Sequence, residues 1–215
     1  MSLNSCCEVY LIRHGQTKWN VEGKLQGHTD ESLNEDGEKQ ALALRAKLEK
    51  IKFDAAFSSD LSRSNKTAAI VLGSQNIEIV RNPALRERYM GVWEGRLTSD
   101  LKSWFKEQEI STDSFSKEEY LSYKWQNDIE SYSDVYQRLN DFIKTQAISR
   151  LGSTILLSSH GGVLRALLYH LDFRPELRWQ VSNCAYIKLL VNEAGEISIV
   201  ECEGINLTEK ATIPF

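Results

Sequence analysis

Apolar residues in this chain fall into short runs that alternate with longer amphipathic stretches. Runs typical of buried strands occupy residues 9–12, 54–58, 77–80 and 154–158. Between them, apolar positions recur at helical spacing, which predicts helices over about 34–50, 61–72 and 163–171, and another around Val135, Leu139, Phe142 and Ile143. Asn34 can cap the first of these helices, and Gly73 can close the second. Alternating strands and helices indicate a mainly parallel sheet with helices on both faces.

Two further segments complete this α/β prediction. Residues 185–191 and 196–200 are expected to form a hairpin around Asn192–Gly195, which adds an antiparallel edge to the sheet. The fold class predicted is therefore a three-layer αβα sandwich with a mainly parallel sheet and an antiparallel edge. Residues 96–132 predict a helical insertion that covers one end of this sheet.

The insertion carries seven of the twenty aromatic residues of the chain: Trp104, Phe105, Phe115, Tyr120, Tyr123, Trp125 and Tyr132. Most of these rings are expected to form core. One or two of them are candidates for a lid or specificity wall over a binding site.

Length and composition indicate a single domain over residues 1–215, since no Gly/Ser/Pro-rich linker or repeat divides the chain. The net charge of −4 argues against a general nucleic-acid binder, so an anionic ligand would need locally concentrated positive charge. No apolar run reaches membrane-spanning length, and no signal-peptide pattern is present. Four cysteines without metal-ligand spacing predict reduced thiols in a cytoplasmic protein.

Candidate chemistry gathers where predicted strands end. Arg13 and His14 follow the first strand, Arg63 lies just after the second, and His160 follows the strand at 154–158. The carboxyl ends of parallel strands form the ligand crevice of an open α/β sheet, so these four side chains are expected to converge.

Each of these residues has an ordinary structural explanation when taken alone, such as a polar strand boundary or a solvated helix face. A strand followed by His-Gly near both ends of one chain is harder to dismiss. Two histidines and two arginines suit a doubly charged anion, most simply a phosphoryl group. Glycine after each histidine is expected to let backbone N–H groups approach the ligand closely. No HExxH motif or Cys/His cluster supports a metal site. His28 is a candidate for the pocket lining, and His170 is interpreted as structural at a helix end.

Five segments together resemble the histidine phosphatase superfamily, which includes the cofactor-dependent phosphoglycerate mutases. They are LIRHGQTKWN, LQGHTDESLNEDGEKQA, FSSDLSRSNKTA, LRERYMGVWEG and SSHGGVLRALL, and they span nearly the whole chain. The resemblance implies a phosphoglycerate mutase-like fold. It also implies that His14 is the nucleophile that becomes phosphohistidine, and that Glu87 is the acid/base.

The remaining site residues follow from the same resemblance. Arg13, Arg63 and His160 match the other members of the phosphate pocket. Positions that match phosphate- or substrate-lining residues are Asn20, Thr17, Gln26, Gly27 and Gly161. Lys24 stands where many relatives have arginine. A backbone carbonyl near Gly15 is the expected acceptor that fixes the tautomer of His14.

The implied function is a phosphomonoesterase that hydrolyses a small phosphorylated metabolite through phosphohistidine, without cofactor or metal. A phosphoglycerate mutase is the alternative, because the motifs do not distinguish water from a second substrate as phosphoryl acceptor. A non-catalytic phosphoester-binding protein is a third. Glu94 is the other candidate for the acid/base. Without a catalytic role, Glu87 would be explained as a surface residue that forms an ion pair with Arg86 or Arg88. The expected partner is a small phosphate ester, with no nucleic acid and no membrane, and the chain is a monomer or homodimer.

Overall fold

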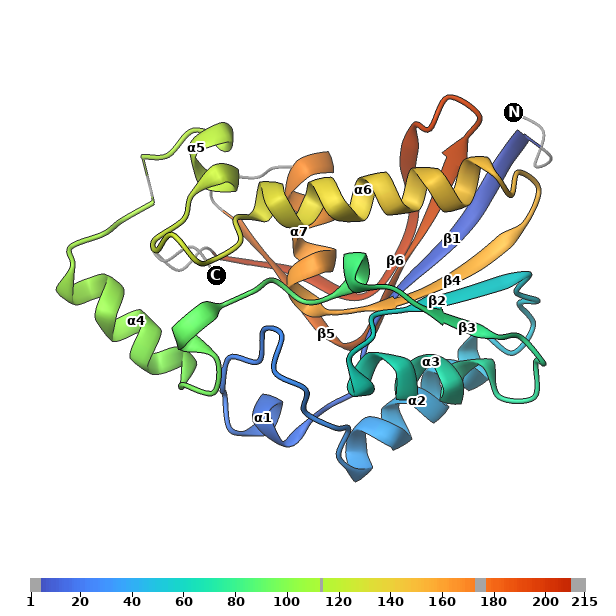
Figure 1. The fold of residues 1–215 in the computed structure, drawn as a ribbon, viewed down its shortest axis with the longest axis horizontal. Coiled ribbons are helices and arrows are strands. Elements are labelled where there is room, and N and C mark those ends of the chain that lie inside the picture. The colour runs from blue at the N-terminus through green and yellow to red at the C-terminus, as the bar shows by residue number, and fades with distance from the viewer. Residues whose placement is uncertain (1–4, 113, 173–176, 210–215) are drawn as a thin grey trace.

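The computed structural model describes residues 5–112, 114–172 and 177–209. A six-stranded sheet with the order β3-β2-β4-β1-β5-β6 forms its centre. The strands β1 (Cys6–Arg13), β2 (Ala55–Ser58), β3 (Ile79–Arg81) and β4 (Thr154–Ser159) are parallel, while β5 (Leu177–Asn192) and β6 (Ile197–Glu209) form the antiparallel edge. The predicted sheet is therefore confirmed (Figure 1).

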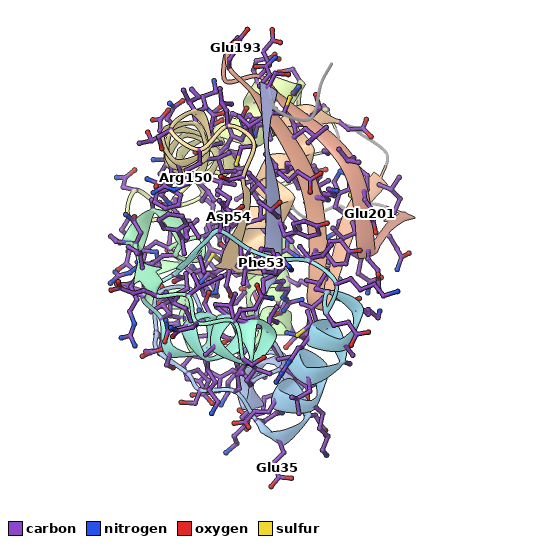
Figure 2. All side chains as sticks on the ribbon, turned by 90° about the vertical axis from the view of Figure 1, so that its right-hand side faces the viewer. Glu35, Phe53, Asp54, Arg150, Glu193 and Glu201 are labelled. Carbon is purple, nitrogen blue, oxygen red and sulfur yellow. The ribbon has the colours of Figure 1, made fainter. Side chains whose placement is uncertain are left out.

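Helices cover both faces of this sheet. α2 (Glu35–Lys47) and α3 (Ser62–Leu72) lie on one face, and α6 (Tyr132–Ile148) and α7 (Gly161–Leu171) on the other (Figure 1). Side chains alternate along a strand, so Tyr10 and Ile12 of β1 pack with the first pair, while Val9 and Leu11 pack with the second. Figure 2 shows the sheet from its side, with Glu35 at the start of α2 and Glu193 in the β5–β6 turn at opposite ends.

Local signals placed most helix ends correctly. The Asn34 side chain accepts a hydrogen bond from the Gly37 N–H (2.8 Å) and caps α2, which ends at Lys47 rather than near residue 50. Gly73 closes α3 with φ +58°. The short helix α1 (Lys18–Val21) was not predicted, and Thr17 caps it through a capping box with Asn20.

In its described residues, the predicted helical insertion at 96–132 consists of two separate helices joined by irregular segments. It contains α4 (Thr98–Glu107) and α5 (Lys117–Ser122) and lies beyond the carboxyl ends of the parallel strands (Figure 1). Rings of Phe105, Trp125, Tyr120 and Tyr132 are buried, so most of its aromatic residues are core as expected. Residue 113 of the insertion lies outside the described part, as do 1–4, 173–176 and 210–215 of the predicted domain.

Within the described ranges, no helix is both long and apolar enough to cross a membrane.

Candidate active site

Strand register brings His14 and His160 together. β1 and β4 are adjacent parallel strands in which Arg13 lies opposite Ser159, and the His14 N–H donates to the Ser159 carbonyl (3.0 Å). The next residue on each strand is a histidine, and the two ring centroids lie 5.1 Å apart. The convergence predicted from the strand ends is thus present in the structure.

The His14 ring is fixed in one tautomer. Its Nδ1 lies 2.7 Å from the Gly15 carbonyl, which can only accept, so Nδ1 carries the proton and Nε2 the lone pair. Burial, followed by the charges of Arg63 and Arg13, lowers the pKa of His14 well below its usual value. His14 is therefore neutral at pH 7 with a free nucleophilic nitrogen, and the expected carbonyl partner is confirmed.

His160 is fully buried, and within the described residues neither ring nitrogen has a hydrogen-bond partner. Burial, followed by the charges of Arg63 and two further arginines, lowers the pKa of His160 well below its usual value. Buried polar atoms are nearly always satisfied, so an unpartnered pair here indicates a place for ligand oxygens.

Arg63 and Arg13 are held by backbone carbonyls. Arg63, fully buried at the start of α3, donates to the carbonyls of Thr29 (2.7 Å) and Gly27 (2.9 Å). Arg13 donates to the carbonyl of Val181. In both guanidinium groups, Nε has no partner among the described residues. Burial and the charge of Arg165 lower the pKa of Arg13 to about 10, which leaves it charged at pH 7.

Glu87 lies in the loop after Leu85, and among the described residues its carboxylate is bound by backbone donors alone. Its carboxylate accepts from the N–H groups of Arg88 (2.8 Å) and Gly162 (3.0 Å). The proposed ion pair with a neighbouring arginine is wrong on the described contacts. Arg86 pairs instead with Asp60, and the Arg88 guanidinium stacks on aromatic rings.

Glu94 has a different environment. Its carboxylate accepts from the N–H groups of His28, Thr29 and Met90 and from the Thr29 hydroxyl. These contacts occupy both oxygens in tying one loop to another, and Glu94 is not among the described residues that line the pocket. The preference for Glu87 over Glu94 is consistent with this geometry.

A pocket of about 200 Å³ opens beside these side chains. Six of the ten predicted site residues line it: Arg13, His14, Asn20, Gln26, Gly27 and Glu87. Its other lining residues are Lys24, Leu25, Arg88, Met90, Thr98, Tyr132, Gly162, Arg165 and Arg178. Five cations and one carboxylate in this wall concentrate positive charge on a chain whose net charge is −4. An anionic ligand fits such a wall.

Four predicted residues stand behind this lining rather than in it. His160 and Arg63 are buried beneath it, as described above. Thr17 is fully buried, and its hydroxyl caps α1 and holds Asn20. At Gly161 a Cβ would lie 3.1 Å from Arg13 Nε, so this glycine makes room for the guanidinium.

The expectation that the glycine N–H after each histidine meets the ligand is wrong at Gly15. The N–H of Gly162, two residues after His160, is likewise occupied by a protein group. The Gly15 N–H donates to the Thr67 hydroxyl (3.0 Å), and the Gly162 N–H donates to Glu87. These donors therefore position protein groups instead of meeting the ligand directly.

Sequence reasoning did not place three of the lining arginines in the site: Arg88, Arg165 and Arg178. The uncharged lining residues Leu25, Met90, Thr98 and Gly162 were not predicted either. Arg165 lies one turn into α7 after His160, inside the quoted SSHGGVLRALL segment, and that position was the available signal. Arg178 precedes the predicted start of its strand. Tyr132 is the one ring of the insertion's seven that lines the pocket, as the wall interpretation expected.

The other two histidines lie outside the lining among the described residues. His28 Nε2 lies 2.8 Å from the Glu87 carbonyl. His170 stacks on Tyr136 and bonds the Ala166 carbonyl at the end of α7, so its structural interpretation is confirmed. No group of three potential metal ligands gathers in the described part of the chain, and all four cysteines are free.

Comparison with known proteins agrees with the family resemblance that the sequence motifs indicate. The family described as "Histidine phosphatase superfamily (branch 1)" matches residues 9–202. The chain is 31% identical over 185 residues to a probable phosphoglycerate mutase GpmB of Serratia proteamaculans, covering 83% of this chain and 82% of that protein.

Two solved structures share the fold. Bacillus stearothermophilus YhfR is 30% identical with a TM-score of 0.75, over 92% of this chain and 96% of that one. A mycobacterial glucosyl-3-phosphoglycerate phosphatase, solved with VO3, is 25% identical with a TM-score of 0.70, over 85% and 92% of the two chains.

Proposed function

This chain belongs to the histidine phosphatase superfamily, and on that premise we propose that it hydrolyses a small phosphomonoester through a phosphohistidine on His14. The observation that carries the proposal is the state of His14. It is buried, neutral and locked in one tautomer by the Gly15 carbonyl, and it lines a cationic pocket that also holds Glu87.

The reaction divides into two displacements. In the first, His14 Nε2 attacks phosphorus, the bond from phosphorus to the ester oxygen breaks, and Glu87 donates a proton to the departing oxygen. In the second, water attacks the phosphohistidine while ionised Glu87 takes its proton, which releases phosphate and restores both groups. Acid–base help of this kind contributes roughly 10²–10⁴ in rate.

The buried cations stabilise the transferring group. The unpartnered Nε atoms of Arg13 and Arg63 and the ring nitrogens of His160 are donors for phosphoryl oxygens. His160 is neutral in the protein alone, because burial lowers its pKa. A bound phosphate dianion favours its protonated form, so we expect it to be charged in the complex.

The pocket also favours a particular substrate class. Its volume of about 200 Å³ suits a small metabolite. Arg165 and Arg178 add positive charge beyond the phosphate-binding groups, and Arg165 Nε has no partner among the described residues. We therefore favour a substrate with a second acidic group, such as a carboxylate, over a neutral alkyl phosphate.

Mutase activity is the second candidate, supported by the name of the Serratia relative. The first displacement is the same, and a substrate hydroxyl replaces water in the second. Hydrolysis is preferred because the insertion at 96–132 is short compared with the substrate-covering segment that the resemblance implies for a mutase. A cytoplasmic, metal- and cofactor-independent enzyme, monomeric or homodimeric, completes the proposal.

The test is phosphate release from a panel of esters, with His14→Ala as the control. The panel contains 3-phosphoglycerate, 2,3-bisphosphoglycerate, fructose-2,6-bisphosphate, α-ribazole phosphate and an aryl phosphate. Release that is lost in His14→Ala supports the proposal. Conversion of 3-phosphoglycerate to 2-phosphoglycerate without release identifies a mutase instead, and binding without any turnover identifies a phosphoester-binding protein.

A further inference from the structure

Arg138, on the outer side of the pocket wall, binds the loop that carries Glu87. We call residues 84–89 the acid loop. Arg138 Nη1 donates to the carbonyls of Ala84 (2.8 Å) and Arg86 (2.7 Å), and Nη2 donates to the carbonyl of Glu87 (3.0 Å). One guanidinium group therefore holds three carbonyls within four residues, ending at the acid/base itself.

The backbone carbonyls of the acid loop need hydrogen-bond donors from outside the loop. Apart from the one-turn 3₁₀ helix Pro83–Leu85, the acid loop has no regular structure, so its carbonyls lack the partners that a helix or sheet supplies. Arginine offers five donors in a rigid planar fork, which lysine does not. The type of residue at position 138 thus matches the number and arrangement of acceptors.

Glu130 fixes the arginine in turn. Its carboxylate accepts from Arg138 Nε (2.9 Å) and Nη2 (3.0 Å), and also from the Tyr89 N–H (2.8 Å) at the end of the acid loop. The Glu130 carbonyl accepts from Arg88 Nε (2.6 Å). Burial alone would raise the pKa of Glu130, but hydrogen bonds and charge from Arg138 hold it below its usual value, so the pair is ionised at pH 7.

These contacts constrain the side of the acid loop that faces away from the pocket. Among the described residues, neither Arg138 nor Glu130 lines the pocket, so neither is placed to touch the substrate. On the other side, the Glu87 carboxylate is held by the N–H groups of Arg88 and Gly162. The carbonyl of Glu87 and its carboxylate are thus anchored independently, which leaves the carboxyl group little freedom to move.

We propose that Arg138, oriented by Glu130, is a positioning residue that places the Glu87 carboxyl group for proton transfer to the leaving oxygen. This inference rests on the proposed function, in which Glu87 is the general acid. A displacement of about 1 Å from the reactive geometry can cost on the order of 100-fold in rate, so the arginine matters without contacting the substrate.

Dependence on the leaving group tests this proposal. A 4-nitrophenolate departs readily without a proton, whereas an alkoxide requires one. Arg138→Met is therefore expected to lower kcat/KM for an alkyl phosphate by about 10- to 100-fold, and for 4-nitrophenyl phosphate by less than about 3-fold. A general loss of folded structure would lower both values equally.

A double-mutant cycle with Glu87→Gln sharpens the test. If Arg138 acts through Glu87, adding Arg138→Met to Glu87→Gln costs little further activity toward the alkyl phosphate. Arg150→Met is the matched control. Arg150 is a partly buried arginine just beyond the far end of α6, and its guanidinium lies over the Phe57 ring, away from the acid loop. Its variant is expected to keep the wild-type ratio between the two substrates.

Glu130→Gln serves as the second variant if Arg138→Met does not fold. It keeps a hydrogen-bonding side chain but removes the ion pair, so a smaller loss with the same preference for the alkyl substrate is expected. Equal losses on both substrates, or full additivity with Glu87→Gln, would overturn the inference while leaving the phosphatase proposal intact. A wild-type enzyme without hydrolysis of either ester would instead contradict the proposed function.

Discussion

The backbone N–H of Gly162 donates to the carboxylate of Glu87 at 3.0 Å, and this contact joins the start of α7 to the acid loop. A Cβ at position 162 would lie 2.2 Å from Glu87 Oε1. Two segments 75 residues apart therefore meet at a point where only a glycine leaves room for the carboxyl group.

This contact predicts that Gly162→Ala separates activity from stability. The added methyl group displaces the carboxyl group of Glu87, while alanine favours the helical conformation at this position. We expect kcat/KM for an alkyl phosphate to fall by about 10- to 100-fold. The melting temperature should stay near that of the wild type. A variant with unchanged kinetics would show that the carboxyl group moves aside without consequence.

Replacement of the two candidate acids should give different results. Glu87→Gln removes the transferable proton, and we expect kcat to fall by roughly 10²–10⁴ toward an alkyl phosphate. Glu94→Gln should mainly weaken the four hydrogen bonds that its carboxylate accepts, three of which come from the His28–Thr29 loop, so it lowers the stability and leaves the leaving-group dependence unchanged. Steady-state kinetics with alkyl and aryl esters, paired with thermal unfolding, distinguish the two. The assignment is reversed if the Glu94 variant shows the stronger leaving-group dependence.

The buried histidines make stability depend on pH. The pKa values of His14 and His160 are held well below 6.5 in the folded protein, mainly by burial. As pH falls through about 6.5, the unfolded chain therefore binds protons that the folded protein does not, and the free energy of unfolding decreases. Each histidine contributes at most about 1.4 kcal/mol per pH unit.

Denaturant unfolding between about pH 7.5 and pH 5.5 measures this slope, since most carboxylates titrate below that window. His160→Gln removes one of the two buried histidines, so its slope should be shallower than that of the wild type. Parallel pH profiles for the two proteins would mean that folding does not lower the pKa of His160.

Metal removal is predicted to have no effect. Arg13, Arg63 and His160 supply the positive charge that a metal ion provides in other phosphoryl-transfer sites. Phosphate release after dialysis against EDTA should equal that of untreated enzyme. Lost activity that returns on adding a divalent cation would contradict this prediction.

The part of the site that sequence could predict is the part that strand geometry determines. His14 and His160 follow adjacent parallel strands, so their meeting needs only the sheet order. The position of Arg165 one turn into α7 has no comparable rule, because an arginine on a helix is usually solvated. The role of Arg138 could not be predicted from the sequence either. Its partners are carbonyls of an irregular loop, and backbone carbonyls have no sequence signature.

The fold, too, was only partly predictable from the sequence, as strand β5 shows. The sequence predicts a strand over 185–191, a mostly apolar segment that Lys188 interrupts, yet β5 begins eight residues earlier, at Leu177. Gln180 interrupts the apolar pattern there, yet residues 177–181 pair with β6, and a register shift follows between Val181 and Tyr186. Hydrophobic patterning detects the buried part of a strand, whereas pairing along an exposed edge depends on the neighbouring strand.

Detection of a phosphoryl group on His14 tests the central claim most directly. Wild-type and Glu87→Gln enzymes are mixed with an activated aryl phosphate, quenched in alkali to preserve phosphohistidine, and analysed by intact mass and peptide mapping. We predict one phosphoryl group on the His14 peptide, more persistent in Glu87→Gln because activation of water is impaired, and absent in His14→Ala. Phosphate release at full rate by His14→Ala, or a phosphoryl group on another residue, would contradict the account.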